Sequence, residues 1–279
     1  MDELSLDLWI MAVSFLAGLI GSLIGLGGGI IITPLLCLVF GVDIRYAMGA
    51  ALASVIATSS GAAAAYLKDG ISNMRVGLFL CMATTVGAVC GAFLALITDE
   101  ALLSLIFGLA LLVTVLLSLH KKPDLADAVE NSDPLALKFR LPGTMPDANG
   151  QRVAYAVHGV VPGFLIMWVA GVLSGLLGIG SGAFKVVAMD QVMRIPFKVT
   201  TATSNFMIGV TAAASVGVYL KQGYLDPSLV APVALGVLAG AFLGARLLSV
   251  APVGLLRVVF LVGVFFIALE MMAKGLGWG

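Results

Sequence analysis

Long apolar runs separated by short polar segments dominate the chain. The runs cover residues 6–25, 30–40, 45–67, 74–97, 101–119, 153–178, 183–193, 198–220, 227–249 and 254–274. Most approach the length of about 20 residues that a helix needs to cross the hydrocarbon core of a bilayer. The runs are continuous, whereas the strands of a membrane β-barrel would alternate apolar and polar residues. The pattern therefore predicts an all-α integral membrane protein.

The composition agrees with this prediction. The 279-residue chain is 61% hydrophobic and 11% charged, whereas soluble domains are about 25% charged. Its 15 basic and 15 acidic residues balance, so the basic excess typical of nucleic-acid binding is missing. The first residues, MDELSLD, lack the basic start of a signal peptide, so we expect the first run to be retained. We expect a multi-pass protein of the cell inner (cytoplasmic) membrane, in contact with the lipid bilayer and not with nucleic acid.

A polar segment divides the apolar pattern into two units. Residues 120–152 are rich in charge, contain four prolines and are unsuited to crossing a bilayer. We therefore expect a first transmembrane repeat at 1–119, a charged connecting loop at 120–152 and a second transmembrane repeat at 153–279.

The two units match each other at a fixed offset of 153 residues. This offset takes Ala17-Gly18 to Ala170-Gly171 and the Tyr-Leu-Lys triplet at 66–68 to the same triplet at 219–221. The register predicts two homologous five-segment repeats, a construction that many transporters use. If the short runs 30–40 and 183–193 cross the membrane, the repeats are inverted and the N-terminus lies outside. If these runs are re-entrant, the repeats are parallel. The positive-inside rule favours the inverted arrangement.

Each short run follows a glycine-rich break. The first break contains Gly27, Gly28 and Gly29, and the second contains Gly180, Ser181 and Gly182. Close helix packing requires small residues four positions apart rather than side by side, so we interpret both sites as interruptions of a membrane helix. Freed backbone N–H groups and the N-terminus of the next helix attract anions. The alternative is that the glycines serve helix packing alone.

Lys185 is the most informative single residue. It lies three positions after Gly182, and its counterpart at the repeat offset is Ile32. A lysine here opposes the helix dipole and costs roughly 2.5 kcal/mol or more to insert into a membrane. A bound anion would offset both costs. The alternatives are a side chain that snorkels to the lipid headgroups and an ion pair with Asp190.

Other polar candidates accompany the breaks. Thr33 either offers its hydroxyl to a ligand or bonds back to its own helix, and Ser204 and Asn205 either line a pathway or hold helices together. Asp190 either carries a coupling proton or pairs with Arg194, four residues further on. The sequence contains no metal-ligand cluster, nucleotide-binding loop or nucleophile motif. We therefore expect no cofactor, no metal ion, no catalytic residues and no enzymatic activity.

The breaks and their flanks resemble a known family of membrane permeases. The stretches GSLIGLGGGIIITPLL, AGVLSGLLGIGSGAFKVVAMDQV and KVTTATSNFMIGVTAAASVGVY are similar to those of the TauE/SafE family of sulfite or organosulfonate exporters. The second copy departs from the glycine and proline pattern of the first, with Ser181 and Val187. The resemblance implies secondary transport of a small sulfur-containing or carboxylate anion, and it does not specify which one.

These observations predict a secondary transporter that moves a small anion, such as sulfite, an organosulfonate or a similar sulfur oxyanion, by alternating access. Two other interpretations stay open. One is a membrane sulfur-relay protein that uses Cys37, which lies close to the first break. The other is a passive anion channel. The direction of transport, proton coupling and assembly into a homo-oligomer also stay open.

Overall fold

A computed structural model describes residues 3–24, 28–68, 71–119, 132–146, 151–247 and 253–277. The first unit contains the helices α1 (Glu3–Ile24), α2 (Gly29–Val39), α3 (Ile44–Lys68), α4 (Met74–Ile97) and α5 (Glu100–Leu119). The second contains α7 (Val160–Leu177), α8 (Gly182–Val187), the π-helical turn η2 (Ala188–Val192), α9 (Phe197–Lys221), α10 (Pro227–Leu247) and α11 (Val253–Gly275). The predominantly helical architecture that the apolar runs predict is confirmed.

Three of these helices are long and apolar enough to cross a membrane within the described residues: Met74–Ile97, Val160–Leu177 and Phe197–Lys221. Shorter apolar stretches lie in α1, α2, α5 and α10. Large apolar side chains such as Leu78, Phe93 and Leu165 are exposed on these helices. Because a soluble protein rarely exposes extended apolar surface, these faces fit contact with lipid.

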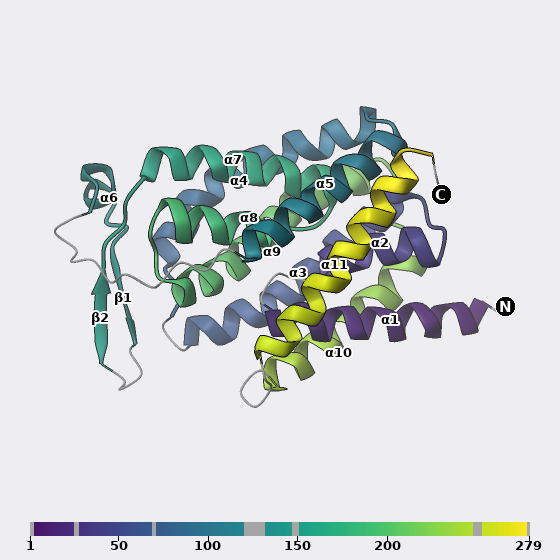
Figure 1. The fold of residues 1–279 in the computed structure, drawn as a ribbon, viewed down its shortest axis with the longest axis horizontal. Helices are drawn as coiled ribbons and strands as arrows, with labels where there is room; N and C mark the ends of the chain where they lie inside the picture. Colours follow the sequence, from purple (N-terminus) through teal and green to yellow (C-terminus); the bar gives the residue numbers. More distant parts are fainter. Residues whose placement is uncertain are drawn as a thin grey trace.

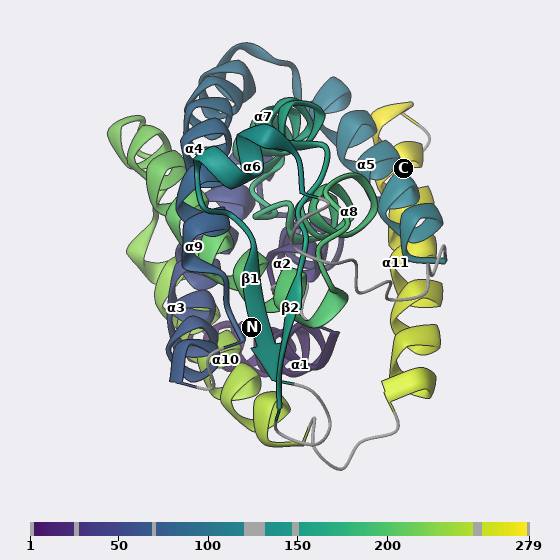
Figure 2. The ribbon, with the colours of Figure 1, turned by 90° about the vertical axis from the view of Figure 1, so that its left-hand side faces the viewer.

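The long helices run along the longest dimension of the molecule (Figure 1). α1 packs against α10, α4 packs against α7, and α3 contacts α9. Figure 2 shows α5 and α11 side by side at one flank of the bundle. The N-terminus lies at one end of the bundle, and α7 begins near the opposite end (Figure 1). The first helices of the two units therefore start from opposite ends.

A small hairpin caps the end of the bundle where α7 begins. It consists of α6 (Pro134–Lys138) and the antiparallel strands β1 (Gly143–Pro146) and β2 (Arg152–Tyr155). Asn73, which caps α4 by accepting a hydrogen bond from Val76 N–H, also donates from Nδ2 to the carbonyl of Leu141 and to Oη of Tyr155. This amide joins the hairpin to the bundle.

The structure also corrects the expected start of the apolar run at residue 153. The apolar run predicted from residue 153 starts as a strand, and the helix begins only at Val160, after Gly159 with its positive φ of 54°. The strand forms because residues 152–155 pair with 143–146. Such a pairing depends on the partner strand, and the local apolar pattern does not reveal it.

Candidate functional site

The second break is a tight turn between α7 and α8. Gly178 and Gly180 have φ values of +67° and +70°, and Ser181, which follows, has a φ of +47°. Left-handed backbone costs a residue with a side chain about 1–2 kcal/mol. Ser181 is therefore a strained position, and strain of this kind gathers at functional sites.

The second break sends the chain back towards its starting end. The amide of His158, before α7, donates to the carbonyl of Met193, after η2, over 3.0 Å. A Cβ atom on Gly159 would lie 2.6 Å from the carbonyl oxygen of Val192. α7 and the segment 182–192 therefore form a returning helical pair. Eleven residues of helix span about 16 Å, and the run ends beside the start of α7, so the structure favours the re-entrant alternative over a crossing by this short run alone.

The first break lies directly against the second. α2 begins at Gly29, which is buried, and Gly28 precedes it; Gly27 lies outside the described residues. A Cβ atom on Gly29 would lie 2.8 Å from Cγ2 of Val55 and 3.3 Å from the carbonyl oxygen of Gly178. A Cβ atom on Gly180 would lie 3.3 Å from Cγ1 of the same Val55. The two breaks therefore meet around one valine side chain of α3.

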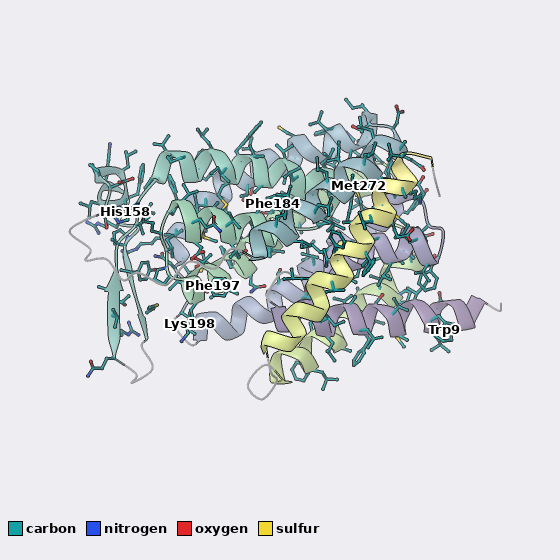
Figure 3. All side chains as sticks on the ribbon, viewed as in Figure 1. Trp9, His158, Phe184, Phe197, Lys198 and Met272 are labelled. Carbon is teal, nitrogen blue, oxygen red and sulfur yellow. The ribbon has the colours of Figure 1, made fainter. Side chains whose placement is uncertain are left out.

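Both breaks are near the middle of the molecule. Phe184 of α8 lies between Trp9 near one end and His158 near the other (Figure 3). A ligand at this depth would be far from either water phase. Any charge that it carries must therefore be matched by groups of the protein.

Lys185 is buried beside the second break and has no exposed surface. Its Nζ donates to the carbonyl of Gly180 over 3.0 Å and to Oγ1 of Thr211 over 2.9 Å. The Thr211 hydroxyl donates to the carbonyl of Met207 over 2.6 Å and lies 3.2 Å from Oγ1 of Thr84. Complete burial excludes the snorkelling alternative for Lys185. It also places the amino group of Lys185 inside the bundle next to a strained turn.

Three buried hydroxyl groups at the breaks have no hydrogen-bond partner among the residues that the structure describes. They are Oγ1 of Thr33 in α2, Oγ of Ser174 in α7 and Oγ of Ser181. Thr33 lies one turn after Gly29, on the helix that begins beside Gly178. A buried polar group without a partner costs about 1–3 kcal/mol, so these hydroxyls are available to a polar ligand.

The remaining candidates have different surroundings. Ser204 Oγ approaches the carbonyl of Gly182 at 3.4 Å, so Ser204 lies at the second break. Asn205 donates from Nδ2 to the carbonyl of Thr201, one turn earlier in its own helix, over 3.0 Å. Asp190 lies in the π-helical turn, partly exposed and engaged in an interaction. Of these three, Ser204 has the clearest connection to the break.

The structure does not place Cys37 beside the first break, where the sulfur-relay hypothesis expects it. Cys37 is buried in α2, and its electrostatic neighbours are Lys274, Asp43 and Glu100, at the far end of that helix from the break. Cys81 of α4 is instead the thiol that interacts with Lys185. Among the described residues, no group of three or more His, Cys, Asp or Glu side chains is placed to hold a metal ion.

Sequence reasoning missed Ser174 and Thr84 as parts of this region. Ser174 precedes Gly178 by one helical turn, and the contact between Thr84 and Thr211 joins residues 127 positions apart. Ser174 could have been identified from the sequence, because it is a small residue just before a predicted break. Thr84 carries no local signal, because its place depends on how α4 packs against α9.

The geometry defines a class of protein: a multi-pass helical membrane protein with two interrupted helices that meet inside the bundle beside a buried lysine. Comparison with known proteins then identifies the family. Residues 10–271 match the family model described as sulfite exporter TauE/SafE, and the chain belongs to this family. It is a membrane transporter.

Two relatives from Bacillus subtilis (strain 168) are named probable membrane transporter proteins. YunE is 29% identical over 245 residues, which cover 85% of each chain. YdhB is 27% identical over 244 residues, which cover 87% of this chain and 91% of the relative. No solved structure shows a significant match. The relatives support transport and name no substrate.

Proposed function

We propose that this protein is a secondary transporter of the cytoplasmic membrane that binds a small anion, such as sulfite or an organosulfonate, where the two breaks meet. Lys185 is the observation that carries the proposal. Its side chain is fully buried, and the hydrogen-bond partners that the structure gives it are the neutral groups of Gly180 and Thr211. In its protonated form Lys185 would be costly here without a counter-charge, and an anionic substrate supplies that charge.

The substrate would be held by one cation and by several dipoles. Lys185 forms a charge-assisted hydrogen bond to the anion, which is shorter and stronger than a neutral one. The hydroxyls of Ser181, Thr33 and Ser204 lie at the breaks, and two of them lack a partner at present. Backbone N–H groups of Gly28, Gly29, Gly180 and Gly182 complete the proposed set, because glycine lets a ligand approach the chain closely.

The proposal includes an internal repeat, which the glycine contacts support. Gly87 of α4 abuts Trp168 of α7, and at the 153-residue offset Gly240 of α10 abuts Phe15 of α1. The same offset and the same exchange relate the contact of Gly171 with Thr84 to that of Gly18 with Val237. A two-fold relation between the units explains why these contacts occur in pairs.

We further propose an inverted arrangement with three full crossings and one returning helical pair in each half. Because such a pair makes no net crossing, each half crosses the membrane an odd number of times, and re-entrant short runs are compatible with inversion. α1 and α7 start from opposite ends of the bundle, which favours inversion (Figure 1). With the N-terminus outside, the hairpin end faces the cytoplasm, together with Arg75, Arg194 and Lys198, as the positive-inside rule prefers. Rocking of one repeat against the other would then alternate access to the site.

The first test is transport by purified protein in liposomes. Sulfite, short sulfonates, sulfate and short carboxylates are offered in turn, and uptake is compared with that of protein-free liposomes. We expect saturable uptake of at least one monovalent anion, and faster uptake when the same anion is preloaded inside. Uptake that rises linearly with concentration, without acceleration by preloading, would indicate a passive channel. Absence of both binding and uptake for the whole panel would contradict the proposed function.

Cys37→Ser separates transport from a sulfur relay. A relay through this thiol would be abolished by the substitution, because the hydroxyl is not a comparable nucleophile. We expect the variant to keep transport, because Cys37 lies at the other end of α2 from the break. Loss of activity with an intact fold would favour the relay.

A further inference from the structure

The hydrogen bonds of Lys185 fit an amine that carries two hydrogens. Its Nζ lies 3.0 Å from the carbonyl oxygen of Gly180 and 2.9 Å from Oγ1 of Thr211. The Thr211 hydroxyl donates its only hydrogen to the carbonyl of Met207 over 2.6 Å, so its oxygen accepts from Lys185. A neutral amine donates two hydrogen bonds, and both are accounted for. An ammonium donates three, and the third has no acceptor within the described part of the chain.

The charged groups around Lys185 do not supply a counter-ion. The elements packed against α8 are η2, α5, α7 and α9. Their titratable or charged side chains among the described residues are Asp190 in η2, Glu100 in α5, and Lys198, Tyr219 and Lys221 in α9. The electrostatic neighbour that the structure assigns to Lys185 is none of these but the thiol of Cys81 in α4. The empty site thus stabilises an uncharged amine better than an ammonium.

We propose that Lys185 is the proton-coupling residue of this transporter, and that it binds the anion as an ammonium and returns empty as a neutral amine. The inference rests on the proposed function and adds its coupling mechanism. Each anion then crosses together with one proton. The loaded site contains one positive and one negative charge, and the empty site contains none.

The proton balance of this cycle is closed. On the side where the anion enters, the amine takes one proton from water and becomes an ammonium, and the ammonium donates the new hydrogen to the anion. On the opposite side, the anion leaves and the ammonium returns the proton to water. The net result is movement of one anion and one proton in the same direction, without net movement of charge.

The cycle also explains why the empty protein can change its conformation. A lone ammonium inside the bundle would resist reorientation, because it would have to stay beside water or a counter-ion. A neutral amine satisfied by Gly180 and Thr211 can be carried through a closed state. Asp190 is less suited to this role, because it is partly exposed in the π-helical turn and already engaged in an interaction.

The first experiment measures proton uptake on binding. Wild-type protein in detergent, in weakly buffered solution at pH 8, is titrated with the sodium salt of the anion that liposome transport identifies, and a pH dye reports proton uptake. We expect uptake approaching one proton per bound anion. In proteoliposomes, one unit of imposed pH gradient is expected to drive about tenfold accumulation. An imposed potassium diffusion potential is expected to change the rate less than about twofold. Anion binding without proton uptake would overturn the inference while leaving the proposed function intact.

The second experiment changes the side chain. Lys185→Arg retains a cation that does not release its proton. We expect this variant to bind the anion without proton uptake and to exchange internal for external anion, while its net uptake falls at least tenfold. Asp190→Asn tests the other carrier, and its proton uptake per bound anion is expected to equal that of the wild type. Coupled net uptake by Lys185→Arg, or loss of proton uptake in Asp190→Asn with binding retained, would contradict the assignment. If Lys185→Arg does not fold, the wild-type measurement still decides.

Discussion

Where the second break has Lys185, the first has Ile32, 153 residues earlier and equally buried. The same comparison pairs Ser204 with Ala51, and Thr84 with Val237, and all four of these residues are buried. Both breaks rely on glycine for close packing, yet polar side chains gather at the second. The difference indicates that the helical framework is shared by both halves, whereas recognition of the charge belongs mainly to one.

The largest effect is expected from a matched pair of substitutions at these two positions. Lys185→Met removes the cation at similar volume, and anion affinity should fall about 150- to 5,000-fold, because loss of one partner of a buried charge pair costs about 3–5 kcal/mol. Ile32→Met conserves volume, and its affinity should stay within about threefold of the wild type. Binding is measured by calorimetry on purified protein. Equal losses in the two variants would remove the asymmetry.

The glycines should differ in how their substitution can be rescued. In Gly29→Ala, the new methyl group meets the side chain of Val55, and the free energy of unfolding should fall by about 1–3 kcal/mol. Adding Val55→Ala makes room and should recover part of the loss. In Gly180→Ala, the alanine meets Ile208 and must also adopt a φ of +70°, which costs about 1–2 kcal/mol more.

The matched rescue of Gly180→Ala is Ile208→Ala. It should recover less than Val55→Ala does, because relief of the contact leaves the backbone strain in place. Thermal and denaturant unfolding in detergent provide the values. Equal rescue in the two pairs would show that the strained turn contributes little.

Substitution of Ser181 by glycine should raise the stability of the protein and lower its affinity for the anion. Ser181→Gly relieves the left-handed backbone and should stabilise the empty protein by about 1 kcal/mol. It also removes a hydroxyl, so anion affinity should fall about three- to tenfold. Ser181→Ala keeps the backbone strain and should lower affinity without this gain in stability. A Ser181→Gly variant with unchanged affinity would remove this hydroxyl from the site.

The smallest effect is expected at Thr33, the polar contribution of the first break. Thr33→Val replaces a buried hydroxyl that has no partner with a methyl group of similar size. Stability should be unchanged or slightly higher, and anion affinity should fall about two- to fivefold. A loss as large as that of Lys185→Met would make the two breaks equal partners in binding.

The sequence predicted the helices better than it predicted the site. Continuous apolar runs located α3, α4 and α9 closely, and the glycine-rich break before the short run 30–40 indicated a helix start close to that of α2 at Gly29. Apolarity does not encode direction, so the sequence left the return of α8 towards Gly159 as the less favoured of two alternatives. The hairpin strands depend on pairing between residues 143–146 and 152–155, which the local apolar pattern does not reveal.

The sequence also predicted only some residues of the candidate site. Lys185 was found because a lysine is rare and costly at this depth, and Ser181 because it stands in a glycine-rich break. The hydroxyl groups next to Lys185 were harder to identify, because Thr84, which contacts its partner Thr211, comes from a helix in the other half of the chain. Long-range packing decides which hydroxyl faces the lysine, and one sequence does not contain that information in a readable form.

The central claim is that one anion binds at the second break, against Lys185. The most direct measurement is an anomalous difference map at the selenium edge, from crystals grown with the selenium analogue of the anion that the protein transports. The account predicts a single strong peak within about 4.5 Å of Lys185 Nζ, because a short charge-assisted hydrogen bond and one selenium–oxygen bond together span at most this distance. A peak beside Ile32, or elsewhere with Lys185 still bonded to Gly180 and Thr211, would contradict it.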